Sequence, residues 1–248
     1  MSRFASLFLL LSLSLFYSCN NLSKSKNIDL YINGEWIGAG AAYGPFRDGQ
    51  YPGGESPSIP ELREDLHIIS KNWNWIRVYG SRGITKDLLN IIKEDRLNIK
   101  VMLGAWIAKE VDDEASKSNL NEINEAIRLT KDYPEIINSI NIGNETMVFW
   151  SDHIVDVSTM KKYIEYTSRR VDVPVSTADD FNFWNKEESK IIAEVSDFII
   201  VHIHPLWGGL TSEKSLDWVK KIYSEIKSFH PKKTIVIGET GWATKKHS

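Results

Sequence analysis

Hydrophobic and polar positions along this chain follow two patterns in turn. Amphipathic segments have helical spacing, as in residues 59–72, which follow the helix-capping residue Ser58, and in residues 215–229. Between such segments, apolar and β-branched runs of strand length occupy residues 36–44, 75–80, 99–107, 137–144, 173–179, 198–205 and 234–240. Strand, helix and strand at about thirty residues per unit predict repeated βαβ units and a parallel sheet that is buried on both faces.

Two architectures use this alternation: the open doubly wound sheet and the closed (β/α)8 barrel. A doubly wound nucleotide binder would place a glycine-rich phosphate turn and a helix after its first strand. The glycine-rich residues 38–44 lead instead into Pro45, Arg47 and further turn residues. Polar and aromatic residues also follow the predicted strands, where barrel enzymes collect their active sites. We therefore predict an α/β fold of the (β/α)8 TIM-barrel type, preceded by a short hairpin around Asn33-Gly34.

The predicted strands stop one short of a complete barrel. Seven are found before Ser248, and a (β/α)8 barrel has eight. We expect the eighth unit to be missing from this sequence, since an unclosed barrel would leave strand edges and core exposed. The alternative is a sheet that is naturally incomplete or closes differently.

The first residues have the pattern of an export signal. Arg3 precedes an apolar run of about a dozen residues, which suits a signal h-region and is short for a membrane span. The only cysteine, Cys19, follows at a position that resembles a bacterial lipobox, where cleavage leaves a lipidated cysteine. We expect a lipoprotein-type signal peptide over 1–19, a tether over 20–27 and the barrel domain over 28–248. The protein would then be exported and lipid-anchored to the bacterial cell envelope, periplasmic or at the cell surface; the alternative is a leftover thiol in a discarded signal.

Composition limits the partners. The 248 residues are 42% hydrophobic, enough for one sizeable core, and carry a net charge of −3 from 30 basic and 33 acidic residues. Basic residues near the C-terminus alternate with apolar ones, as on a solvated helix face, so nothing indicates nucleic-acid binding. We expect one globular domain, a monomer, whose membrane contact is through a lipid anchor only.

Two glutamates carry the candidate chemistry. Glu145 ends the fourth predicted strand and Glu239 ends the seventh, so in a closed barrel they face each other across one mouth. Glycoside hydrolysis requires at least such a pair of carboxyl groups. One, protonated, donates its proton to the leaving oxygen, and the other, ionised, attacks the anomeric carbon. Each glutamate alone would more often be a solvated loop residue.

The motifs around these glutamates resemble glycoside hydrolase family 17, the β-1,3-glucanase and glucanosyltransferase family. "IGNET" and "IGETGWAT" look like its acid/base and nucleophile motifs, and "AAYGPFRDGQ" and "IRVYG" look like its bacterial branch; the resemblance runs from about Trp36 to Thr244. It implies a retaining hydrolase of β-1,3-glucan, of the laminarin type, that needs no cofactor. Glu145 would be the acid/base and Glu239 the nucleophile that forms a glycosyl-enzyme intermediate. Their carboxyl groups would lie ~5 to 5.5 Å apart.

The resemblance also assigns Asn144 to a sugar hydroxyl next to the reacting carbon. Strict strand alternation would send Asn144 and Glu145 to opposite faces, so we expect a twist or bulge there. Arg77 and Tyr79 share a face, and a pair between Arg77 and Glu239 would lower the pKa of Glu239, while Glu145 keeps its proton. The alternative partners of Arg77 are backbone carbonyls or Asp179.

Aromatic and polar residues at strand ends would bind the sugar units. As substrate-binding residues we predict Tyr43, Arg77, Tyr79, Asn144, Asp179, His204, Trp207 and Trp242. By contrast, we expect Trp73, Trp75 and Trp218 to serve packing, and His202 to lie buried below His204.

Three other functions stay open. A β-1,3-glucan transglycosylase would use the same intermediate, and a non-catalytic glucan-binding surface lipoprotein would bind without turnover. A metal-dependent barrel hydrolase would use the H-x-H pair His202 and His204, with Asp179 as a third ligand. We expect no metal, because the other histidines fall on predicted helices or loops.

Overall fold

The computed structural model describes residues 25–32 and 34–243. The predicted signal peptide, Cys19 and most of the predicted tether lie outside the described residues. Contacts with the folded part begin at Lys26, whose Nζ donates to the backbone oxygens of Ser168 and Val171. Within the described part, no helix has the length and apolarity that a membrane span requires.

Strands and helices alternate along the chain as the apolar pattern predicts. The strands are β1 (Tyr31–Ile32), β2 (Glu35–Trp36), β3 (Ala41–Ala42), β4 (Trp75–Arg77), β5 (Lys100–Ala105), β6 (Ile137–Asn144), β7 (Val175–Asp180), β8 (Ile199–His202) and β9 (Ile235–Glu239). The helices are α1 (Ile59–Ile69), α2 (Thr85–Glu94), α3 (Asp113–Asp132), α4 (Val157–Ser168), α5 (Phe181–Trp184), α6 (Ser189–Val195) and α7 (Ser212–Phe229).

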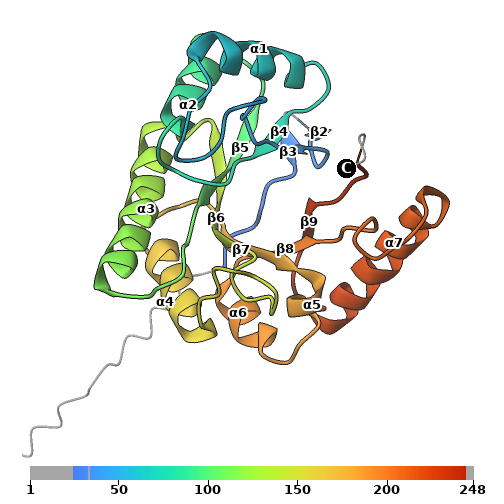
Figure 1. The fold of residues 1–248 in the computed structure, drawn as a ribbon. Helices are drawn as coiled ribbons and strands as arrows, with labels where there is room; N and C mark the ends of the chain where they lie inside the picture. Colours follow the sequence, from blue (N-terminus) through green and yellow to red (C-terminus); the bar gives the residue numbers. More distant parts are fainter. Residues whose placement is uncertain (1–24, 33, 244–248) are drawn as a thin grey trace, which may run out of the picture.

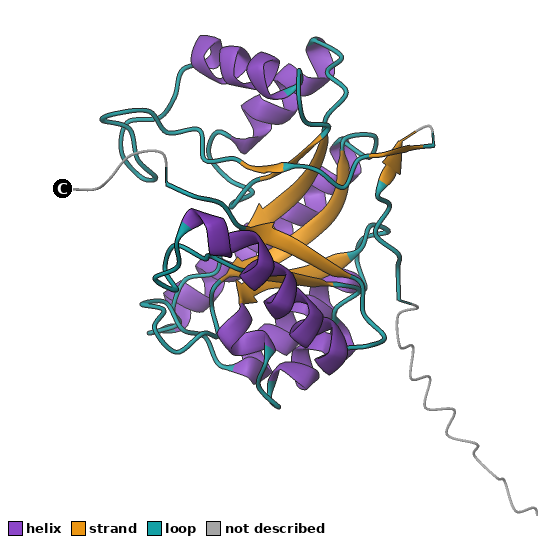
Figure 2. Cartoon of the chain, turned by 90° about the vertical axis from the view of Figure 1, so that its right-hand side faces the viewer, coloured by secondary structure: helices purple, strands orange, loops and turns teal. Residues whose placement is uncertain are grey.

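Strands β3 to β9 form one parallel sheet in which neighbours in sequence are neighbours in space. At least one helix connects each pair of strands, and the helices surround the curved sheet (Figures 1 and 2). The seven strands bend nearly into a barrel, which confirms the predicted fold class. The predicted hairpin is also confirmed, because β1 pairs antiparallel with β2.

Helix α1 shows how local sequence sets an element. Ser58 accepts a hydrogen bond from the backbone of Glu61, whose side chain accepts one from the backbone of Ser58, so the helix begins with a capping box. Leu62, Leu66 and Ile69 are its buried residues, one every three or four positions. The apolar positions that the sequence predicts for this helix therefore form the face that packs on the barrel.

Strands β4, β5, β7 and β8 divide their apolar residues between two clusters, because successive side chains point to opposite faces. The larger cluster joins strand residues such as Ile76 and Val101 to helix residues such as Leu62 and Leu88, and so lies between sheet and helices. The smaller cluster holds residues at alternate positions, which face the inside of the barrel: Trp75, Met102, Ala178, Phe198 and Ile200.

Candidate active site

The inner face of the sheet changes from apolar to polar toward the C-terminal ends of the strands. Arg77 lies two positions after Trp75, and His202 lies two positions after Ile200. Both are therefore on the inner face, and both are almost completely buried. Inside the barrel, apolar residues therefore lie toward the N-terminal ends of the strands, and charged and hydrogen-bonding groups lie toward the C-terminal ends.

Strand β6 ends in an irregular segment that aims Glu145. The pairing of β6 with β7 shifts register between Asn141 and Asn144, Gly143 has φ 75° and Glu145 has φ 51°. A positive φ is uncommon for a residue with a side chain, and here the Glu145 backbone N–H is held by the carbonyl of Ala178 at 2.9 Å. The predicted irregularity between Asn144 and Glu145 is confirmed.

Glu239, at the end of β9, is held by three side chains. Its Oε1 accepts from Arg77 Nη1 at 2.7 Å and from the Tyr79 hydroxyl at 2.9 Å, and its Oε2 lies 3.3 Å from His204 Nε2. Burial alone would raise the pKa of Glu239, but the hydrogen bond from His204 and the Coulombic effects of His202 and Arg77 outweigh it and hold the pKa well below its ordinary value. The predicted pair of Arg77 with Glu239 is confirmed.

Arg77 also contacts Asn144, the residue before Glu145. Its Nη2 donates to Asn144 Oδ1 at 2.5 Å. One buried guanidinium therefore orients both Glu239 and the amide beside Glu145.

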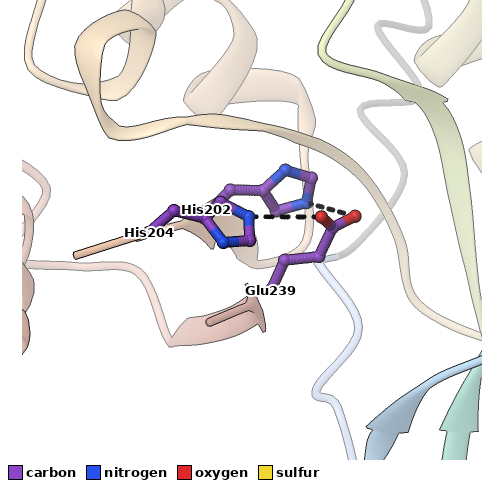
Figure 3. Close-up of side chains that lie close together, drawn as sticks. All are labelled: His202, His204 and Glu239. Carbon is purple, nitrogen blue, oxygen red and sulfur yellow. Dashed lines mark hydrogen bonds and ion pairs between the residues drawn. The ribbon is translucent and has the colours of Figure 1, made fainter. Parts of the chain in front are cut away.

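His202 connects the two glutamates. Its Nδ1 lies 2.9 Å from Glu145 Oε1, and its Nε2 lies 3.6 Å from Glu239 Oε1. The ring has no exposed surface, and Figure 3 shows the side chains of His202 and His204 directed at Glu239. The sequence predicts a buried His202, but it does not reveal this bridge, since nothing in a single chain tells which carboxylates face an inward histidine.

Besides Arg77, two further predicted substrate-binding residues are buried. Asp179 has no exposed surface, and its two carboxyl oxygens accept from the backbone N–H groups of Met147 and Asp180. Burial raises the pKa of Asp179 to about 8 in spite of these bonds. Tyr43 is also buried and donates its hydroxyl to Asp65. Neither side chain has the exposure that direct contact with a bound sugar requires.

A cleft of about 710 Å³ opens beside the glutamates. Glu145, Glu239, His204 and Trp207 line it, and the Trp207 side chain is 79% exposed. Sequence reasoning missed its other lining residues, which are Trp150, Asp180, Phe181, Asn182, Gly208 and Trp218.

Trp218, which we expected to serve packing, lines the cleft, and Trp242, which we expected to bind substrate, does not. Trp218 packs edge-on against Phe181, with ring centroids 5.4 Å apart, yet it also lines the cleft rather than serving packing alone. Trp242 is 43% exposed and lies three residues after Glu239, outside the set that lines the cleft. Trp150 could have been found, because it ends an aromatic pair in the loop that follows Glu145.

Within residues 25–32 and 34–243, one set of side chains could hold a metal ion. Ligand atoms of His202, His204 and Glu239 all lie within 4.8 Å of one another. Asp179, the third ligand expected for the alternative metal site, is not in this set, and its carboxyl oxygens are instead bonded to backbone N–H groups.

Comparisons with known proteins show the family of this chain. The family model of the BtgE/BtgC glycoside hydrolase domain matches residues 40–248. A glucan endo-1,3-beta-glucosidase of Emericella nidulans is 23% identical over 201 residues, 75% of this chain. A glucan 1,3-beta-glucosidase of Schizosaccharomyces pombe is 24% identical over 192 residues, 73% of this chain. The matches span only 29% and 58% of these relatives.

Among solved structures, an endo-laminarinase from Formosa superposes with a TM-score of 0.70 at 25% identity. The match covers 83% of this chain and 66% of the laminarinase. Because the family model covers most of the sequence, including every residue of the site, this chain belongs to the BtgE/BtgC glycoside hydrolase domain family.

Proposed function

We propose that this protein is a retaining β-1,3-glucan hydrolase in which Glu239 is the nucleophile and Glu145 is the general acid/base. The observation that supports it most is the unequal environment of the two carboxylates in one cleft. Glu239 accepts from Arg77 and Tyr79 and lies beside His204, whereas Glu145 is joined to His202. Pairs of carboxyl groups with different surroundings are how glycosidases divide the two roles.

In the first step, an oxygen of Glu239 forms a bond to the anomeric carbon while the bond to the leaving sugar oxygen breaks. That oxygen takes the proton of Glu145. In the second step, water gives a proton to Glu145 and its oxygen attacks the anomeric carbon, which releases Glu239. The lowered pKa of Glu239 keeps the nucleophile ionised for the first step.

The surroundings of the glutamates would hold the glucan. Asn144, oriented by Arg77, is placed beside Glu145 to bond the hydroxyl next to the reacting carbon. Trp207 and Trp150 present exposed rings at the cleft, and flat rings suit the apolar faces of glucose units. The β-1,3 linkage rests on the names of the relatives.

The test uses laminarin and the variants Glu145→Gln and Glu239→Gln. Hydrolysis by the parent protein should release the β-anomer first by NMR, and each variant should lose roughly 10²-fold or more of its rate. Glu125→Gln, on the outer surface of α3, is the matched control and should keep full activity. Initial release of the α-anomer would contradict retention.

Two further outcomes separate the alternatives. Products longer than the substrate would indicate transglycosylation, in which a sugar replaces water in the second step. A parent protein that binds laminarin as tightly as Glu239→Gln and releases no sugar would indicate a glucan-binding protein, and would overturn the proposal.

We also propose export of a monomer that is lipid-anchored at Cys19, which rests on the sequence alone. Cys19→Ser should move the mature protein from the membrane fraction of a bacterial host to the soluble fraction. The intact mass should show the lipid on the parent protein only. An unmodified Cys19 in the mature parent would refute the anchor.

A further inference from the structure

His202 leaves one buried nitrogen without a hydrogen bond. Nδ1 is engaged by Glu145, but Nε2 has no hydrogen-bond partner among the described residues, although the ring is fully buried. The nearest carboxylate oxygen, Glu239 Oε1, is 3.6 Å away, which is too long for a hydrogen bond. Buried polar atoms are normally satisfied, so this nitrogen suggests a ligand that has its place between Nε2 and Glu239.

The distances around this gap suit a metal ion. His204 Nε2 lies 3.3 Å from Glu239 Oε2, and His202 Nε2 lies 3.6 Å from the other oxygen, Oε1. One ligand atom from each of the three residues lies within 4.8 Å of the other two. Ligands bound tetrahedrally to Zn²⁺ at about 2.0 to 2.1 Å are roughly 3.3 Å from one another. Two imidazoles and a glutamate are also a known donor set for zinc with an open position.

Glu145 fits the outer part of such a site. Histidines that bind metals usually donate their second ring N–H to a carboxylate, which fixes the tautomer and leaves a lone pair toward the ion. His202 Nδ1 faces Glu145 in this way, so its Nε2 would present a lone pair toward Glu239. Arg77 contacts Oε1 of Glu239 and leaves Oε2, on the side of His204, as the oxygen nearest the ion.

We propose that His202, His204 and Glu239 form a binding site for a divalent ion of the zinc class, and that the ion inhibits the enzyme. This inference rests on the proposed function, because inhibition follows from the role of Glu239 as the nucleophile. The bound ion occupies Glu239 Oε2, the carboxylate oxygen that Arg77 and Tyr79 leave available to attack the anomeric carbon. Ion and glucan therefore exclude each other, and inhibition is reversed by a chelator.

Binding is measured on the protein without a histidine tag, using Co²⁺ as the probe. Bound Co²⁺ should give the visible absorption of a low-coordinate ion with nitrogen and oxygen ligands, and Zn²⁺ should displace it. His204→Gln and Glu239→Gln should each weaken Co²⁺ binding at least about tenfold, and Glu145→Ala, which removes only the outer partner, roughly tenfold. His204→Gln is preferred to a His202 variant because His204 is partly exposed and its replacement is less disruptive to folding.

The control is His67→Gln. His67 is an exposed histidine on α1 that also contacts a carboxylate, Asp95. It shares the histidine–carboxylate contact with the proposed site but lies on the surface, apart from the three proposed ligands. This variant should bind Co²⁺ like the parent. An absence of the visible bands, or bands that persist unchanged in His204→Gln and Glu239→Gln, would overturn the proposed site.

Inhibition is measured separately with Zn²⁺ and laminarin. Zn²⁺ should raise the apparent KM and leave kcat unchanged, and EDTA should restore the rate. Co²⁺ binding without any competition would overturn the inhibitory role. A protein that binds Co²⁺ at this site and never cleaves laminarin would refute the proposed function instead, so the two failures are distinguishable.

Discussion

Arg77 shows how much of the site depends on one side chain. It is buried, it contacts the Glu239 carboxylate, and it holds the amide of Asn144. A guanidinium is charged at any working pH and offers several donors in one plane, so it can orient two acceptors at once. Glu145 is a second case, because its left-handed backbone, which costs about 1–2 kcal/mol, is what turns its side chain into the cleft.

Replacing Arg77 should change the pH dependence of catalysis. Arg77→Met removes a positive charge and a hydrogen-bond donor beside Glu239, so the pKa of Glu239 should rise. The acid limb of kcat/KM on laminarin, which reports ionisation of the free enzyme, should move to higher pH.

Arg128→Met is the control for this experiment. Arg128 pairs with Glu125 and Asp132 on the outer surface of α3, so its loss should leave the profile in place. If Arg77→Met and the parent protein had the same acid limb, Arg77 would not set the pKa of Glu239.

At the scale of elements, strand β5 and the segment that follows β4 approach so closely that only glycine fits at one position. A Cβ on Gly104 would lie 2.3 Å from the backbone carbon of Tyr79 and 2.4 Å from the backbone oxygen of Val78. This segment presents the Tyr79 hydroxyl to Glu239. The close contact of two backbones thus sets the position of a site residue.

Gly104→Ala should therefore affect stability and activity together. The added methyl meets backbone atoms that cannot rotate away, so we expect a loss of about 1–3 kcal/mol in the free energy of unfolding, measured with urea. Laminarin hydrolysis should also fall as Tyr79 is displaced.

Gly44→Ala provides the comparison. Its Cβ would meet nothing within 4 Å, so its effect on unfolding should stay within about 0.5 kcal/mol. Equal effects of the two substitutions would show that the crowding at Gly104 is relieved without cost.

For the whole molecule, folding buries acidic groups that would otherwise be ionised in water. Asp179 is the strongest example, since burial raises its pKa to about 8, and burial also raises the pKa of Asp180. The folded state consequently holds a proton on Asp179 that the unfolded chain releases above about pH 4. Stability must fall with rising pH wherever the folded state binds more protons than the unfolded state.

Asp179→Asn tests this linkage. Between about pH 4 and about pH 8, Asp179 should reduce the parent's stability by up to about 1.4 kcal/mol per pH unit, and the variant should lack this contribution. Urea unfolding across that range measures the difference between the two proteins, with the exposed Asp132→Asn as control. A difference that does not depend on pH would contradict the protonated state of Asp179.

Much of this architecture could be predicted from the order of residues. The alternation of apolar runs and amphipathic segments determined seven parallel strands, the capping box determined where α1 begins, and the spacing of the two glutamate motifs determined which strands carry them. Such features are local, since backbone hydrogen bonding and side-chain period act within a few residues. The pairing of Arg77 with Glu239 was accessible too, because a buried guanidinium requires an acid.

Tertiary structure alone decided which predicted residues reach the cleft. Asp179 and Tyr43 end strands or follow them as the site residues do, yet their side chains are buried under neighbouring elements, while Trp150 and Trp218 enter the cleft from a loop and a helix. His202 contacts both glutamates only because β6, β8 and β9 converge on the inside of one curved sheet. Residues far apart in the chain meet through the curvature and register of that sheet, and neither is encoded within any short stretch of sequence.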